Sequence, residues 1–451
     1  MNPPGMGPPG MGSPGMASID MLVTNGTVLA MDAADTVIEN GAVAISGDCI
    51  AEVGPAAGFS GHQAGQVVDA RGGIIMPGLV NTHNHAAMTC FRGLADDLEL
   101  MTWLHDHIFP AEAHLTEEKV YQGALLACAE MILSGTTCFS DMYLFEDGVA
   151  RAAKTAGMRA VVGEVLYDFP SPNYGPIENG FAYTHGLIDK WRGDDLITVA
   201  VEPHSPYLCA PELLAEAEAI SAANNVPLII HVAETRSETE TIQSTYGKTP
   251  VAHLADAGLL SPRLVACHCV VLTDDDISLL RQKNVKVSHN PESNMKLAAG
   301  VAPVPKLLDA GVCVGLGTDG CTSNNNMDML AEMDTAAKIH KVNCLDPTVM
   351  DARRVLRMAT IDGARVLGLD ERTGSLEKGK KADLIVVDTN KPHLTPMYHA
   401  DSHLVYAAGR ADVAATVING RLLMRDRELL SLDREAVMAA VNEIAEEIRR
   451  G

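Results

Sequence analysis

The feature that most constrains this chain is an alternation of helical stretches and short apolar runs between about residues 77 and 370. Helical patterns over Glu117–Ser134, Pro211–Asn224 and residues 274–283 are separated by strand-like runs such as residues 197–201. Repeated strand–helix units of this kind are typical of a (β/α)8 barrel, an α/β fold in which helices surround parallel strands. In such a barrel, side chains at the carboxyl ends of the strands meet on one face.

The residue pattern at both ends of the chain differs from that of the barrel region. Residues 21–53 contain short alternating runs with Gly and Asn turns, which predict separate strands at 21–24, 27–31, 41–45 and 49–53. Similar runs return at residues 382–388 and 413–420. This pattern predicts a small β-sandwich formed by both chain ends, with the barrel inserted between them. The predicted division is a disordered Pro/Gly/Met tail (1–17), the N-terminal half of the sandwich (18–76), the barrel (77–370), the C-terminal half of the sandwich (371–430) and a C-terminal helix (431–451).

Polar residues end four of the apolar runs in the barrel region. They are Asn-Thr-His-Asn-His at 81–85, His-Val-Ala-Glu at 231–234, Cys-His-Cys at 267–269 and Gly-Thr-Asp-Gly at 317–320. His83 and His85 lie at i and i+2 on a strand, so they point the same way and can share one ion. An isolated His-x-His pair is more often incidental, but three further polar strand ends on the same face make one pocket. Imidazole and carboxylate ligands suit zinc, and this set predicts a metal-dependent hydrolase.

Charge and cysteine usage limit the partners of the chain. It has 34 basic and 58 acidic residues, which give a net charge of −24 at pH 7. This balance repels phosphate backbones and anionic lipid, and there is no long apolar span, so we expect neither nucleic-acid nor membrane binding. The N-terminus lacks the basic and apolar regions of a secretory signal, and the ten cysteines form no C-x-x-C pair. We therefore expect a cytoplasmic protein that acts on a small molecule.

Several motifs resemble a known family. Pro-Gly-Leu-Val-Asn-Thr-His-Asn-His at 77–85 and Phe-Arg-Gly-Leu-Ala-Asp-Asp at 91–97 resemble the amidohydrolase superfamily. Within it, the chain is similar to the 5'-methylthioadenosine/S-adenosylhomocysteine deaminases and the related chlorotriazine hydrolases. The resemblance covers about residues 20–430 and includes residues 203–207 and 288–297. It implies the barrel-plus-sandwich fold and zinc-dependent hydrolytic deamination of an adenine nucleoside.

Carried over position by position, the resemblance implies that His83, His85, His231 and Asp319 bind one Zn²⁺ per subunit. Fe²⁺ or Mn²⁺ can occupy similar nitrogen and oxygen sites. Zinc lowers the pKa of its bound water to about 7 and so supplies a nucleophile at neutral pH. Asp319 would also accept the proton of this water as a general base.

Two further residues receive catalytic roles from the resemblance. Glu234 would face the substrate, deliver a proton to the ring nitrogen and help ammonia leave. His268 would stabilise the attacking oxygen or the oxygen on the tetrahedral carbon. The alternative for Glu234 is an N-cap acceptor or a surface carboxylate, and the alternative for His268 is a core histidine with satisfied hydrogen bonds.

Three other residues are expected to contact the substrate. Glu112 matches a family position that binds ribose hydroxyls, and a carboxylate accepts two O–H donors well. His204 matches a position near the nucleoside. Trp103 would pack on the sugar or on its 5' substituent, with an ordinary core tryptophan as the alternative.

The segment after the third barrel strand departs from the family. Better-known members carry arginines there that meet the charged homocysteine tail, whereas residues 163–176 contain no arginine and show Glu164 instead. A carboxylate tail would lack its charge-assisted partner at this place. We therefore expect 5'-methylthioadenosine or adenosine to be preferred over S-adenosylhomocysteine.

Three rival functions are kept beside this one. Chlorotriazine hydrolysis does not require a ribose-binding Glu112. Deamination of a free base would leave Glu112 and Trp103 without a sugar partner. A catalytically inactive binding protein would show a broken metal set, but none of the four ligand positions is broken. The expected protein is a homo-oligomeric aminohydrolase whose partner is a small-molecule nucleoside.

Overall fold

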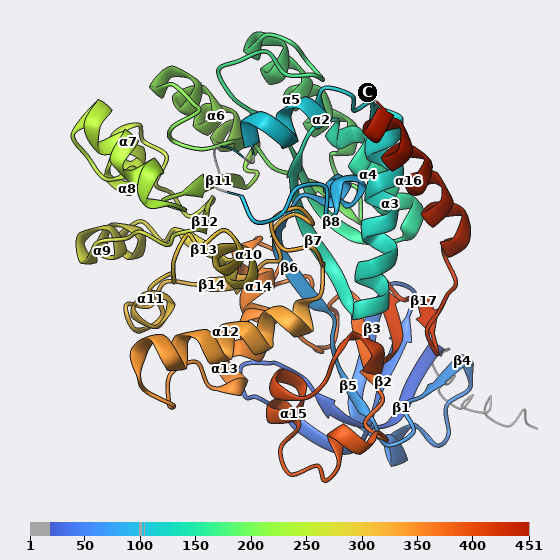
Figure 1. The fold of residues 1–451 in the computed structure, drawn as a ribbon. Helices are drawn as coiled ribbons and strands as arrows, with labels where there is room; N and C mark the ends of the chain where they lie inside the picture. The colour runs from blue at the N-terminus through green and yellow to red at the C-terminus, as the bar shows by residue number, and fades with distance from the viewer. Residues whose placement is uncertain (1–18, 99–101, 103, 451) are drawn as a thin grey trace, which may run out of the picture.

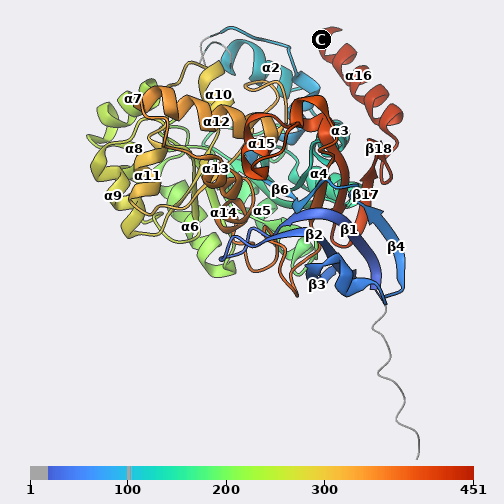
Figure 2. The same ribbon diagram turned by 90° about the horizontal axis from the view of Figure 1, so that it is seen from below.

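The computed structural model describes residues 19–98, 102 and 104–450. A barrel with surrounding helices occupies the upper part of Figure 1, and blue and red strands from the two chain ends lie together below it. Figure 2 shows β1–β4 at one side of the molecule, away from helices α6–α9. Within the described residues, no helix combines the length and the apolar character needed to cross a lipid bilayer.

The two chain ends build one nine-stranded sheet. Its strands are β1 (Ile19–Leu29), β2 (Val37–Ser46), β3 (Cys49–Pro55), β4 (Ala64–Asp69), β5 (Ile74–Pro77), β15 (Leu384–Val387), β16 (Val413–Ile418), β17 (Arg421–Arg425) and β18 (Glu428–Leu429). Their order is β18-β17-β16-β15-β5-β1-β2-β3, with β4 beside β1. The antiparallel pair β5–β15 joins the two ends of the chain.

This sheet folds over its own apolar core. Val43 of β2 belongs to the same buried cluster as Val386 of β15 and Val417 of β16, although these strands lie in opposite halves of the sheet. The buried residues alternate with half-exposed ones along β1, as expected for a strand with one face in a core. The predicted small β domain from both chain ends is confirmed.

One local prediction in this sheet was wrong. Residues 21–24 and 27–31 have the pattern of two strands with an Asn-Gly turn between them, but β1 runs without interruption from Ile19 to Leu29. Asn25 has a φ of +60°, and the β1–β2 register shifts around Gly26. A Cβ at Gly26 would lie 2.8 Å from the carbonyl oxygen of Gly73. The Asn-Gly pair therefore forms a bulge, which a strand tolerates, and not a hairpin turn.

The parallel barrel strands lie in two arcs. They are β6 (Leu79–Asn84), β7 (Thr136–Tyr143), β8 (Arg159–Leu166), β9 (Ile197–Val199) with β10 (Glu202–Pro203), and β11 (Leu228–Val232), β12 (Leu264–His268), β13 (Lys286–His289) and β14 (Val314–Leu316). Between the arcs, Ile229 N–H donates to Val201 O at 3.0 Å, and on the other side Asp319 N–H donates to His83 O at 3.0 Å. Since β9 and β10 both pair with β8, they count as one interrupted strand, and the predicted (β/α)8 barrel is confirmed.

Helices cover the barrel. They are α2 (Phe109–Glu112), α3 (Glu117–Ser134), α4 (Glu146–Ala156), α5 (Ile177–Trp191), α6 (Pro211–Asn224), α7 (Arg236–Tyr246), α8 (Pro250–Asp256), α9 (Asp274–Gln282), α10 (Pro291–Lys296), α11 (Val304–Asp309), α12 (Met329–Cys344), α13 (Ala352–Met358), α14 (Ile361–Val366), α15 (Ala400–Tyr406) and α16 (Arg434–Arg450). Single-turn segments are η1 (Ala56–Phe59), η2 (Ala86–Phe91), η3 (Leu104–Ile108), η4 (Pro392–Leu394) and η5 (Arg410–Asp412).

Local capping explains why helix limits agree with the sequence pattern. Thr116 accepts a hydrogen bond from Lys119 N–H at the start of α3, and Gly135 ends the helix with a φ of +87°. At the start of α9, Thr273 and Asp276 form a reciprocal capping box. The last helix, α16, packs along α3 on the outside of the barrel (Figure 1).

A buried ion pair joins the barrel to the sheet. Arg159, at the start of β8, donates from Nε to Asp383 at 2.6 Å, and the two side chains are 1 % and 0 % exposed. Asp383 also accepts from Asn419 N–H at 2.7 Å and from Thr373 Oγ1 at 3.0 Å. Asp383 lies next to β15, so this one carboxylate connects the C-terminal half of the sheet with the barrel.

Candidate active site

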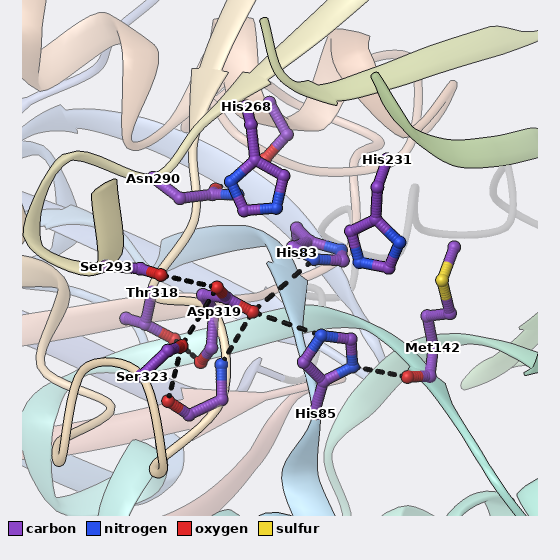
Figure 3. Close-up of polar contacts among 12 residues, drawn as sticks. His83, His85, Met142, His231, His268, Asn290, Ser293, Thr318, Asp319 and Ser323 are labelled. Atoms are coloured by element: carbon purple, nitrogen blue, oxygen red, sulfur yellow. Dashed lines mark hydrogen bonds and ion pairs between the residues drawn. The ribbon is translucent and has the colours of Figure 1, made fainter. Parts of the chain in front are cut away.

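Seven of the nine predicted site residues line one cavity at the carboxyl ends of the barrel strands, and His83 lies beside them. The cavity lining contains His85, Met88, Phe109, Glu112, Met142, Tyr143, Leu144, Val165, Tyr167, His204, Tyr207, His231, Glu234, His268, Leu297, Asp319 and Ser323. In Figure 3 the rings of His83, His85, His231 and His268 surround the Asp319 carboxylate and the space beside it. These side chains come from β6 and the residue that follows it, from β11 and β12, and from the turn after β14.

Two histidines are fixed through the ring nitrogen that faces away from the common space. His85 Nδ1 donates to the carbonyl oxygen of Met142, and His231 Nδ1 donates to that of His204 at 2.7 Å. Both rings therefore direct Nε2 toward Asp319 or His83 (Figure 3). A backbone acceptor on one ring nitrogen is the usual device that orients a histidine whose other nitrogen binds a metal.

The orientation of the Asp319 carboxylate is fixed by contacts to both of its oxygens. Asp319 has a φ of +59°, which turns the chain sharply after β14. Its Oδ1 lies 3.1 Å from His85 Nε2 and 3.6 Å from His83 Nε2. Its Oδ2 accepts hydrogen bonds from Ser293 Oγ at 2.6 Å and Ser323 Oγ at 2.9 Å (Figure 3). One oxygen is thus fixed by hydroxyls while the other faces the histidines.

The donor atoms suit a divalent metal. The potential ligand atoms form two groups, and within each group all atoms lie within 4.8 Å of one another. One group is His83, His85 and Asp319, and the other is His83, His231 and His268. Both ring nitrogens of His83 are buried without a hydrogen-bond partner among the described residues. Burial lowers the pKa of His83 and of His231 well below the usual value, so the rings are neutral and offer lone pairs. Burial opposes ionisation of Asp319, but His85 and neighbouring histidines hold the pKa of its carboxyl well below the usual range.

Glu234 faces the cavity from the end of β11. The N-cap of α7 is Thr235, which accepts from Glu238 N–H, so Glu234 is neither the capping acceptor nor a surface carboxylate. Its side chain is 13 % exposed, and Oε2 lies 3.9 Å from His268 Nε2. Burial raises the pKa of Glu234. Burial thus favours the protonated form of this carboxyl group, the form that can donate a proton.

His268 is oriented by an amide. Its Nδ1 lies 3.0 Å from Asn294 Oδ1, which can only accept, and 3.4 Å from Asn290 Nδ2, which can only donate. The shorter contact favours the tautomer with the proton on Nδ1. Nε2 then points toward Glu234 and toward His83 and His231, two of the predicted metal ligands. His268 has a φ of +69° and is 1 % exposed. The grouping with His83 and His231 makes His268 a further nitrogen that can reach an ion in this space.

The predicted substrate contacts have different outcomes. Glu112, on α2, lines the cavity and accepts from Tyr143 O–H at 2.7 Å. His204 also lines the cavity, with its ring centroid 4.7 Å from that of His231. Burial lowers the pKa of His204 to about 3, so its ring is neutral. Trp103 lies outside the described residues.

Glu164, in the segment that lacks the family's arginines, is not among the residues that line the cavity. Its carboxylate is 1 % exposed in β8 and accepts from Glu146 N–H at 3.0 Å and from Asn173 Nδ2 at 2.8 Å. It therefore ties the start of α4 to the loop after β8. Burial raises the pKa of Glu164 to about 7, although these hydrogen bonds lower it.

A Glu164→Gln variant is expected to gain stability relative to wild type as the pH rises from 5 to 8. In the unfolded chain the Glu164 carboxyl ionises near pH 4.5, whereas in the folded chain it keeps its proton up to about pH 7. Between pH 5 and pH 8, ionisation of Glu164 in the unfolded chain lowers the stability of the wild type by about 2.5 kcal/mol, and glutamine cannot ionise. Urea unfolding of both proteins at pH 5 and pH 8 measures the difference. Glu178→Gln on the exposed face of α5 is the control, and an equal pH response of both variants would contradict the prediction.

Four contributing residues were not identified from the sequence. Tyr143 binds Glu112 and Asn294 binds His268. Ser293 and Ser323 both bind Asp319. A signal existed for Tyr143, since it is a polar residue at the end of an apolar strand run, like the ligands themselves. Ser293 and Asn294 fall within the family-like motif at 288–297, but the motif alone does not tell which side chain they meet.

Several known proteins are similar to this chain along nearly its whole length. Residues 74–423 match the amidohydrolase family. A 5-methylthioadenosine/S-adenosylhomocysteine deaminase of Syntrophobacter fumaroxidans is 59% identical over 95% of this chain and 98% of its own. A 5'-deoxyadenosine deaminase of Methanosarcina mazei is 47% identical over 95% of this chain and 98% of its own. The crystal structure of an adenosine deaminase from Xanthomonas campestris with bound zinc has a TM-score of 0.95 at 40% identity and covers 97% of this chain and 100% of that one.

The barrel, the histidine and aspartate cluster and these matches define a metal-dependent hydrolase, and the chain belongs to the amidohydrolase family. Within that family its relatives at 44–59% identity carry the names of nucleoside deaminases. A triazine hydrolase from Arthrobacter aurescens shares the fold, with a TM-score of 0.88, at only 23% identity.

Proposed function

We propose that this protein deaminates an adenine nucleoside by hydrolysis, with 5'-methylthioadenosine as the favoured substrate. The observation that carries this proposal is that Glu234, His268 and Asp319 line one cavity together with the predicted metal ligands His85 and His231. Glu112 also lines this cavity. The names of the relatives support the same reaction. The balanced reaction adds water at C6 of the adenine ring and releases ammonia, so that the product is the inosine analogue.

We propose zinc as the metal, held by His83, His85, His231 and Asp319. Three imidazoles and one carboxylate are a usual zinc set, and the Xanthomonas campestris structure contains zinc. When bound, such an ion lowers the pKa of water and provides the nucleophile at neutral pH. Ser293 and Ser323 keep Asp319 from rotating, so Oδ1 stays directed at the histidines.

Two side chains move protons in the proposed reaction, and a third stabilises charge. Asp319 accepts a proton from the attacking water as it adds to C6. Glu234, protonated at the start, delivers its proton to the ring nitrogen N1, which removes the negative charge that addition places there. His268 stabilises the developing charge on the added oxygen from a fixed position. Asp319 then passes its proton to the exocyclic nitrogen, which leaves as ammonia, while the hydroxyl on C6 gives its remaining proton back to Glu234 and the C6–O double bond forms.

The ribose is proposed to lie against Glu112. Its Oε1 already accepts from Tyr143, so Oε2 is the oxygen that faces a 2' or 3' hydroxyl. This arrangement favours a nucleoside over a triazine or a free base, because neither rival has hydroxyl groups for a buried carboxylate. His204 and Trp103 are proposed to contact the same half of the substrate.

We also propose that the protein works in the cytoplasm as a homo-oligomer. All ten cysteines are free thiols, as expected for a reducing compartment. Leu345 is 88% exposed and Tyr398 is 81% exposed, so a partner copy that covered them would bury apolar area. Sedimentation velocity measures the assembly, and a monomer at micromolar concentration would contradict it.

An absorbance assay of the zinc-loaded protein tests the function directly. Conversion of adenine to hypoxanthine changes the ultraviolet spectrum, and methylthioadenosine, 5'-deoxyadenosine, adenosine and S-adenosylhomocysteine are compared by kcat/KM. We expect turnover with methylthioadenosine highest and S-adenosylhomocysteine lowest, and loss of turnover after chelation that zinc restores. No spectral change with any nucleoside, despite bound zinc, would reject the proposal.

A further inference from the structure

Two aromatic rings, Phe109 and Tyr167, line the cavity together with Glu112, and Phe169 packs against both of them. Phe109 lies one turn before Glu112 on α2, so both side chains project from the same side of the helix, and both line the cavity. The Phe109 ring is 5.9 Å from the ring of Phe169, which stacks on Tyr167 at 3.9 Å and 12°. We call Phe109, Tyr167 and Phe169 the aromatic wall.

The aromatic wall is close to Glu112 and His204. The His85 ring is 6.0 Å from the Tyr143 ring, and Tyr143 O–H reaches Glu112. Phe109 stands one helical turn from Glu112 on α2, and the Tyr167 ring is 6.5 Å from the His204 ring, which lies 4.7 Å from the His231 ring. With the adenine ring at the metal ligands and the ribose at Glu112, Phe109 is beside the ribose and therefore within reach of the 5' substituent.

The charges of the cavity disfavour an anionic tail. Its described lining includes the carboxyl groups of Glu112, Glu234 and Asp319, and no lysine or arginine is among the described lining residues. A carboxylate on the substrate would lose water there without gaining a charge-assisted hydrogen bond. Aromatic faces and edges, in contrast, make favourable contacts with sulfur and methyl groups.

We propose that the aromatic wall determines the 5' specificity of the site and selects an uncharged apolar substituent such as methylthio. This inference rests on the proposed deamination. Phe109 and Tyr167 contact the substituent, and Phe169 positions both rings by packing against them. The rings of the wall would bind the substituent through dispersion contacts and burial of apolar area, where arginines would bind the charged tail of a homocysteine.

Substrate ratios test the proposal in two variants, Phe109→Ala and Phe169→Leu. For each zinc-loaded protein, kcat/KM is measured with methylthioadenosine and with adenosine, which differ only at the 5' position. We expect the ratio of the two values to fall about tenfold in Phe109→Ala, which corresponds to one aromatic contact with sulfur. A smaller fall in the same direction is expected in Phe169→Leu, because the ring that it supports is retained.

Phe181→Ala is the matched control, because Phe181 on α5 is also half-buried but does not line the cavity. Its ratio is expected to equal that of wild type. An unchanged ratio in the wall variants, or the same fall in Phe181→Ala, would overturn the assignment while leaving deamination in place. If the wild type deaminates no nucleoside, the proposed function itself fails, so the two failures are distinguishable. Far-UV circular dichroism verifies the fold of each variant, and Phe169→Leu keeps the test available if Phe109→Ala does not fold.

Discussion

The Glu234→Gln variant is expected to keep its metal and lose nearly all turnover, with kcat for methylthioadenosine lower by about 10²–10⁴-fold. Glutamine keeps the size of the side chain and its place beside His268, but it has no proton to deliver to N1 of the adenine ring. Glu234 belongs to neither group of potential ligand atoms, so zinc content should not change. Metal analysis and single-turnover kinetics on the same sample measure both quantities.

The control for this variant is Glu240→Gln, the same change on the exposed face of the adjacent helix α7. It should have wild-type kinetics, which separates loss of the proton donor from loss of one negative charge near the site. Full turnover of Glu234→Gln with zinc bound would remove Glu234 from the mechanism. The proposed roles of Asp319 and the histidines would still stand.

Replacing Arg159 by methionine is expected to lower the free energy of unfolding by about 3–5 kcal/mol. The change leaves Asp383 buried at 0 % exposure without its cation, and removal of one partner from a buried pair is more costly than the pair's net contribution. Urea unfolding of the zinc-loaded protein measures the loss. Adding Asp383→Asn should recover part of it, since the asparagine oxygen can still accept from Asn419 N–H and its amide nitrogen can donate to the Thr373 hydroxyl.

Arg151→Met provides the comparison on the surface. Arg151 pairs with Glu117 at 2.7 Å, but the two side chains are 39% and 51% exposed, so water screens the pair. Its loss should cost about 0–1 kcal/mol. Similar costs for Arg159→Met and Arg151→Met would show that the buried pair does not hold the barrel to the sheet.

Local sequence rules predicted the features that depend on neighbouring residues. His83 and His85 share a direction because strand side chains alternate, and α3 begins at a Thr cap and ends at a Gly in the left-handed region. The same rules do not tell that residue 25 forms a bulge, because an Asn-Gly pair fits both a bulge and a hairpin turn. The outcome depends on Gly73, which approaches from a strand far along the chain.

Contacts between distant segments were the features that could not be predicted. Ser293 and Asp319 are separated by 26 residues, and Tyr143 and Glu112 by 31, and only the barrel closure brings each pair together. The place of Glu164 is a similar case. Its strand position is clear from the sequence, but whether the side chain enters the cavity depends on the pleat of β8 and on the start of α4, which supplies its hydrogen-bond donor.

The junction at Gly78 has a consequence for synthesis of the chain. Gly78 alone separates β5, which pairs with β15, from β6, which carries His83. A Cβ at this position would lie 2.1 Å from the Thr137 side chain, so the junction has no space for any residue larger than glycine. From Pro77 to Leu384 is 307 residues (384 − 77), which a ribosome adds in roughly 15–60 s. During that interval the edge of β5 is unpaired, and the first ligand strand acquires its final support only when the last strands have emerged.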